Sequence, residues 1–239
     1  LLQQWILLMR FNTKASLAAL AVLTATPMMA HASSLHTKWE QFKAGRAFRH
    51  LSADGQRAMA DIVQARETLA AGKTDAAIPA LYDAQKRLTA ASKAETKFNA
   101  AESQLQPAPQ HPAAPDHTPA TTPTTWIPVG GEFIATETLA PEKKAAVATA
   151  NGQLKAGQTN QAAQTMQVVG EDADFIVALA PLAQTQGALN RATVFTEGKQ
   201  ASEAVAALDQ ILNGLVFVSE DFAESAMPDH GKAPAKSSH

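Results

Sequence analysis

The sequence predicts an all-α fold of helical hairpins packed as a bundle, with a small extended or hairpin segment near residues 126–135. The chain is 46% hydrophobic, but much of that share is alanine, and only 5% is aromatic. Alanine has the highest helix propensity, whereas strands are enriched in β-branched and aromatic residues. Turn glycines also recur after apolar stripes with helical spacing. Strands are therefore expected only at Ile127–Ile134 and Leu215–Val218.

The N-terminal residues predict export to the periplasm by a cleavable signal peptide. Arg10 and Lys14 precede an apolar run at 15–25, and the small residues Ala30 and Ala32 follow it. This order of charged, apolar and small residues is typical of signal peptides. We interpret residues 1–8 as an upstream extension and residues 9–32 as the signal peptide, so that the mature chain begins at Ser33, which mass spectrometry can check.

An integral membrane span is not expected, because the apolar run is shorter than the roughly 20 residues that a spanning helix needs. The alternative is that residues 1–8 extend this run into a membrane anchor. Arg10, Asn12 and Lys14 would interrupt such an anchor.

Residues 33–106 predict an N-terminal part of three helices. The first covers Thr37–His50, and the second carries an apolar stripe from Met59 to Leu69 and stops at Gly72. The third begins near Asp75, a favourable N-cap residue, and extends to Leu105. Pro79 lies in its first turns, where a missing backbone donor costs least.

A proline-rich linker is predicted at 107–125, because seven of the 13 prolines lie between residues 107 and 128. Proline fixes φ and lacks a backbone donor, which favours an extended segment. A C-terminal helical part is expected at 126–222, with helices resuming at Pro141, and a flexible tail at 223–239.

Three segments follow the order helix, glycine stop, helix, with the glycine at Gly72, Gly157 or Gly198. Such αα-hairpins must stack on one another to bury their apolar stripes. Gly157 and Gly198 are expected to adopt positive φ as C-terminal caps.

A set of short segments combines helix caps with small residues. They are Leu69-Ala70-Ala71-Gly72-Lys73, Trp126-Ile127-Pro128-Val129, Leu139-Ala140-Pro141-Glu142, Ala150-Asn151-Gly152-Gln153-Leu154, Ala180-Pro181-Leu182 and Gly214-Leu215-Val216. These segments resemble the YfdX family of stress-associated periplasmic proteins, over most of residues 50–105 and 125–222. The proline-rich linker departs from the family pattern. The resemblance implies an exported helical protein associated with bacterial stress resistance, and it carries over no catalytic residue.

No catalytic, metal or cofactor site is predicted. The chain has no cysteine, and its seven histidines show no spacing that would suit a metal site. The acidic pairs at 171–174 and 220–221 are explained by helix capping. A net charge of −2 gives no indication of nucleic-acid binding. The chain is therefore not expected to be an enzyme.

One binding site is predicted, with unfolded proteins or small apolar ligands as partners. An apolar stripe from Phe175 to Phe195 is interpreted as one helix kinked at Pro181, and the kink would open an apolar groove. Trp126 and Phe133 would form an aromatic arm over it. The alternative is that these residues form ordinary core.

This site predicts a chaperone-like or ligand-binding role in envelope stress. The competing hypothesis is a structural oligomerisation module that supports an envelope complex, with the chain forming a homo-oligomer.

Overall fold

A computed structural model describes residues 51–113 and 117–226 of the chain. The expected signal peptide at 9–32 and the expected helix at Thr37–His50 lie outside the described residues. Residues 227–239 of the expected tail lie outside them as well.

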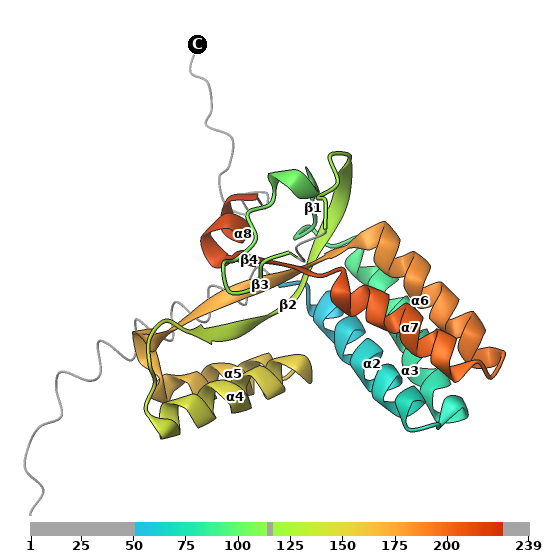
Figure 1. Cartoon of the computed structure of the whole chain (residues 1–239), viewed down its shortest axis with the longest axis horizontal. Helices are drawn as coiled ribbons and strands as arrows, with labels where there is room; N and C mark the ends of the chain where they lie inside the picture. The colour runs from blue at the N-terminus through green and yellow to red at the C-terminus, as the bar shows by residue number, and fades with distance from the viewer. Residues whose placement is uncertain (1–50, 114–116, 227–239) are drawn as a thin grey trace, which may run out of the picture.

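The described residues form a mixed fold with a four-stranded antiparallel sheet, so the all-α prediction is wrong. The strands are β1 (Phe98–Ala101), β2 (Pro123–Ala135), β3 (Ala173–Pro181) and β4 (Val216–Ser219). They lie in the order β1-β2-β3-β4, and β2 and β3 form a long curled ribbon through the centre of the molecule (Figure 1).

The all-α prediction is wrong chiefly at β3, because the sequence predicts that these residues belong to a helix kinked at Pro181. Residues 175–180 are all apolar, because both faces of this strand are buried. A short apolar run of this kind does not distinguish a buried strand from a buried helix. Pro181 does not kink a helix: it is the last residue of β3, and α6 (Leu182–Glu197) begins after it.

The ladder between β2 and β3 extends from Trp126, opposite Pro181, to Ala135, opposite Ala173. It contains a bulge between Pro128 and Gly130, where the register shifts by one residue. Gly131 lies directly against β3. A Cβ atom at this position would lie 2.3 Å from the Ile176 carbonyl oxygen and 2.4 Å from the Phe175 ring, so only glycine allows this approach.

Two helical hairpins form a four-helix bundle at one end of the ribbon (Figure 1). The first is α2 (Ala53–Ala70) with α3 (Thr74–Ala91), and the second is α6 with α7 (Ala201–Asn213). Their apolar faces pack together with the β2 and β3 residues on that side. We call this the bundle core, which includes Ile62, Leu69, Leu81, Leu88, Ile127, Val129, Ala178, Ala180, Leu189 and Leu208.

Polar contacts join the two hairpins across the seams of the bundle. Arg66 on α2 forms an ion pair with Asp209 on α7. On α3, the Gln85 amide donates to Thr193 Oγ1 at 2.9 Å and to Asn190 Oδ1 at 3.1 Å, both on α6. The bundle therefore combines helices from both sides of the proline-rich segment.

The opposite face of the sheet packs on α4 (Pro141–Lys155), α5 (Thr159–Thr165) and α8 (Glu220–Ala226). Short 3-10 turns at Met166–Val168 and Gly170–Asp172 connect α5 to β3. We call the second cluster the sheet core, which includes Phe98, Leu105, Trp126, Phe133, Leu154, Met166, Phe175, Val177, Leu179 and Val218.

Two further helix predictions are wrong in their detail. The third helix ends at Ala91 and not at Leu105, because the chain turns there and Phe98–Ala101 pairs with β2. The acidic residues at 171–174 do not cap a helix: Gly170–Asp172 forms a 3-10 turn, and Ala173 begins β3. Helix α4 does begin at Pro141, as predicted.

Three hairpin turns share one hydrogen-bond pattern, although only part of the glycine prediction is confirmed. Gly157 has φ of 72°, as expected, and so does the corresponding Gly72 at 73°. Gly198 has φ of −76°, and the left-handed residue is Lys199, with φ of 59°. In each turn the next residue donates its N–H to the carbonyl five positions earlier, which is the Schellman arrangement. The third turn is therefore displaced by one residue from the glycine.

Replacing Gly157 with alanine should destabilise the protein by about 1 kcal/mol, because alanine avoids left-handed backbone. Gly152 lies on an exposed part of α4 with open space around its Cα. Gly152→Ala should therefore stabilise the protein by about 0.5–1 kcal/mol through helix propensity. Urea unfolding of both variants measures this, and equal effects of the two substitutions would contradict the assigned turn.

Candidate functional site

The five residues predicted to form a binding site fall into three separate places. Trp126 pairs with Pro181, and Phe133 pairs with Phe175, at opposite ends of the β2–β3 ladder. Phe195 lies on α6 and packs against the bundle core. The structure thus brings together two cross-strand pairs, and it does not form one groove from all five residues.

Trp126 is an interior residue of the described fold. Its side chain is 2% exposed, and its indole Nε1 donates a hydrogen bond to the Ala100 carbonyl at 3.1 Å. It also lies opposite Phe98 in the β1–β2 pairing. A binding role for Trp126 would therefore require β2 to leave the sheet.

Phe133 and Phe175 form the second pair, with ring centroids 5.1 Å apart and ring planes inclined at 54°. Both side chains are buried in the sheet core. Tilted aromatic pairs of this kind stabilise a fold by about 0.5–1.5 kcal/mol beyond their buried area. Their geometry is that of core packing.

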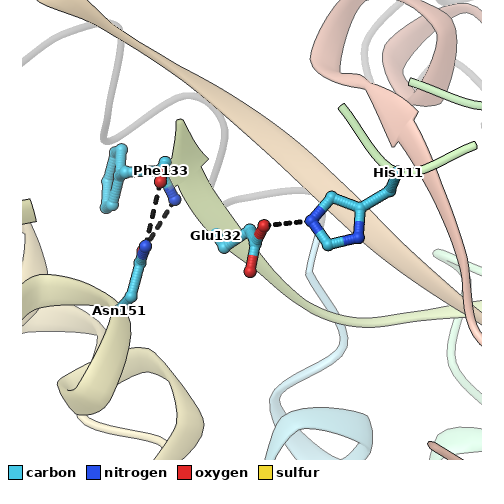
Figure 2. A network of polar contacts seen from close by, with 4 residues as sticks. All are labelled: His111, Glu132, Phe133 and Asn151. Atoms are coloured by element: carbon cyan, nitrogen blue, oxygen red, sulfur yellow. Dashed lines mark hydrogen bonds and ion pairs between the residues drawn. The ribbon is translucent and has the colours of Figure 1, made fainter. Parts of the chain in front are cut away.

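A polar network crosses β2 beside this aromatic pair (Figure 2). The Asn151 side chain on α4 accepts from the Phe133 N–H at 2.7 Å and donates to the Phe133 carbonyl at 2.9 Å. One side-chain amide therefore satisfies both backbone groups of Phe133 on the side of β2 that faces away from β3. On the adjacent residue, Glu132 is in contact with the His111 ring.

The two histidines of the predicted linker both contact glutamates. His111 pairs with Glu132 and stacks on Phe217 of β4, with ring centroids 4.3 Å apart. His117 Nε2 lies 2.5 Å from Glu102 Oε1. No local spacing in the sequence indicates these pairs, because the partners are 21 and 15 residues distant.

The start of this proline-rich segment also joins the sheet. Ala108 donates its N–H to the Phe217 carbonyl at 2.7 Å, and Pro107 forms a bridge with Val218. Together with the stacked His111 ring, these contacts hold residues 107–111 along the outer edge of β4.

Several ionisable groups with shifted pKa values lie in ion pairs between helices or between a helix and a turn. Burial raises the pKa of Asp61, and Arg87, whose Nε is 2.8 Å from Asp61 Oδ2, opposes this shift. The Lys143 ammonium donates to Asp172 and lowers the pKa of that carboxyl. Within residues 51–113 and 117–226, no group of three or more His, Asp or Glu side chains could hold a metal ion.

An open cleft lies where the start of α2 meets the turn between α4 and α5. Its volume is about 500 Å³, within the usual range of small-molecule sites. Leu51, Ala53 and Gly157 supply its small and apolar wall. Its polar wall consists of Gln56, Arg57, Gln158, Thr159, Asn160 and Gln161.

The two walls of the cleft are positioned by specific contacts. Ser52 donates its N–H to the Pro128 carbonyl at 2.9 Å and caps α2 by accepting from the Gly55 N–H. The Thr159 hydroxyl donates to Gln56 Oε1 at 2.7 Å across the cleft. No motif in the sequence indicates this site, because its two walls come from distant parts of the chain. Gln56 and Thr159 are 103 residues apart.

These features define a mixed helix-and-sheet protein with an open polar cleft. A sequence profile of the YfdX family, described as YfdX protein, matches residues 58–221. The chain therefore belongs to the YfdX family, which is not known as a family of enzymes.

YfdX from Salmonella Typhi is among the solved structures that are similar to this chain. The two sequences are 22% identical, and the match covers 71% of this chain and 90% of that one, with a TM-score of 0.41. No curated protein matches the sequence significantly. Among the described residues, no helix is long and apolar enough to cross a membrane.

Asn151→Ala should destabilise the protein by about 1–3 kcal/mol, because it removes the two hydrogen bonds between the Asn151 amide and the backbone of Phe133. Asn213→Ala, at an exposed site on α7, is the control and should change stability by less than about 0.5 kcal/mol. Chemical denaturation measures both values. Equal stability of the two variants would show that Asn151 does not protect β2.

Asp172→Asn should make the protein less stable at neutral pH and less sensitive to acid. Because Lys143 lowers the pKa of Asp172 in the folded state, this pair contributes stability above about pH 4. That contribution disappears as the pH falls through the folded-state pKa. Urea unfolding at pH 7 and pH 3 tests this, with the exposed Asp174→Asn as control. A wild-type and an Asp172→Asn protein with parallel pH profiles would contradict it.

Proposed function

We propose that this YfdX-family chain is an exported, non-catalytic binding protein of the stressed cell envelope, and that it binds its ligand in the cleft between α2 and the α4–α5 turn. The observation that carries the proposal is the cleft itself. It combines a volume suited to a small ligand with side chains that donate and accept hydrogen bonds.

Of the two binding roles, ligand binding has more support than chaperone-like binding of apolar segments. Chaperone-like binding needs a contiguous apolar surface. Within the described ranges, the large hydrophobic side chains that are exposed are Tyr82, Val168 and Val194. Three side chains of this kind do not make a broad apolar surface, whereas the cleft is polar.

Export to the periplasm is part of the same proposal. It is supported by the signal-like order of charged, apolar and small residues in 9–32, and by family membership. The expected start of the mature protein is Ser33, and a retained segment at 9–32 would count against a periplasmic site of action.

A structural oligomerisation role is the second candidate. Tyr82 on α3 and Val194 on α6 are both exposed, and these helices pack against one another in the bundle. A second copy of the chain would cover this apolar pair. Light scattering of the wild type and of a Tyr82→Ser, Val194→Ser variant separates the two roles, because ligand binding requires no change in mass.

Binding in the cleft predicts that the mature protein retains peptides from a tryptic digest of casein, and that filling the cleft abolishes retention. Ala53→Trp fills the cleft from its exposed wall. Ala76→Trp is the matched control, since Ala76 is an exposed alanine in the first turn of α3. Ultrafiltration followed by mass spectrometry measures the retained peptides.

The expected result is retention by the wild type and by Ala76→Trp, and loss of retention in Ala53→Trp. Equal retention by all three proteins would show that the peptides do not bind in the cleft. An apolar dye such as anilinonaphthalene sulfonate should show little fluorescence enhancement with the native protein. Strong enhancement would favour the chaperone-like role instead.

A further inference from the structure

The electrostatics of the cleft depend on one residue. Among the described residues that line it, Arg57 is the one charged side chain, and it is exposed. Within residues 51–113 and 117–226, the ion pairs join other residues, and none of them includes Arg57. A ligand with a single negative charge would supply the missing partner.

The remaining polar groups are chiefly amides, which both donate and accept hydrogen bonds. Gln158, Asn160 and Gln161 contribute three of them from the N-cap and first turn of α5. Gln56 contributes a fourth, and its Oε1 already accepts from the Thr159 hydroxyl. Its amide N–H groups therefore remain as donors. A peptide group, with one donor and one acceptor, is the natural complement of such side chains.

Gly157 lines the cleft without adding a side chain. It has φ of 72°, and a Cβ atom there would lie 4.0 Å from the Ala60 Cβ on α2. The turn is thus in van der Waals range of α2, three residues after Arg57. A planar guanidinium at such a place binds a carboxylate with two parallel hydrogen bonds.

We propose that the cleft binds the carboxylate end of a short peptide, with Arg57 contacting the carboxylate and the amide side chains contacting the peptide groups. This inference rests on the proposed function and names its ligand class. Phosphate is less suitable, because a dianion favours several cations or a glycine-rich loop of backbone donors. The described lining of the cleft offers one cation.

Titration calorimetry with trialanine tests the proposal on the full mature chain. Trialanine should bind, and trialanine with an amidated C-terminus should bind about tenfold more weakly or worse, because a charge-assisted hydrogen bond is lost. Acetate should bind more weakly than trialanine, since it lacks peptide groups. Inorganic phosphate should also bind more weakly.

Arg57→Gln should weaken trialanine binding to the same extent as amidation, and it should remove the difference between the two peptides. Arg191→Gln is the control. Arg191 carries an exposed guanidinium on α6, where it donates to Gln210 at 2.7 Å, far from the cleft in the sequence and on another helix. Circular dichroism and unfolding curves confirm that both variants are folded.

Three results would overturn the inference. They are equal binding of the two peptides, unchanged binding by Arg57→Gln, and binding of acetate or phosphate as tightly as trialanine. Failure here is distinguishable from failure of the proposed function. The wild type could retain casein peptides, with loss of retention in Ala53→Trp, and yet not bind trialanine. In that case the cleft is a binding site, but for another ligand class.

Discussion

The pairing of β2 with β3 is the interaction on which the rest of the structure depends. These strands contribute to both cores: Val177 and Leu179 belong to the sheet core, while Ala178 and Ala180 belong to the bundle core. Each core therefore uses alternate residues of the same strand. The bundle buries part of its apolar surface on this ladder, and α4 packs on β2 from the other side, because a helix stripe needs a surface to cover it.

Two sequence features make the ladder possible. Gly131 permits the close approach of β2 to β3, since any side chain there would overlap Ile176 or Phe175. The bulge at Pro128–Gly130 shifts the register between the part of β2 that faces the bundle and the part that faces α4. Asn151 then satisfies the backbone of Phe133 on the remaining edge, so the strand does not offer free hydrogen-bonding groups there.

This arrangement leaves the candidate binding site at the periphery of the fold. The aromatic side chains of the ladder are buried in the sheet core. Exposing them would require separating the strands that both cores share. The cleft lies instead at a junction of helix ends, where α2 begins and the α4–α5 turn passes. Ser52 fixes the start of α2 to β2, and Thr159 holds Gln56, so the ladder positions the cleft through two short hydrogen-bonded links.

The sequence predicted those elements that local chemistry determines. The α2–α3 and α6–α7 hairpins follow from apolar stripes that end at glycine, and α4 follows from Pro141. The prediction from sequence is wrong where pairing with a strand distant in the sequence determines the structure. Residues 175–180 are equally compatible with a helix, and Phe98–Ala101 becomes a strand only because β2 lies beside it. At the candidate sites, the contacts of Glu132 and Asn151 join residues from distant parts of the chain, so no local spacing indicates them. Arg57 lies in no motif, and its place in the cleft depends on how α2 meets the start of α5.

Native-state hydrogen exchange tests most directly whether the β2–β3 ladder couples the two cores. The account predicts that the amides of Val177 and Leu179 exchange only by global unfolding, with the same opening free energy as the buried amides of α2 and α7. Exchange at Val177 and Leu179 while those helix amides remain protected would show that the bundle is stable without the ladder, and would contradict the account.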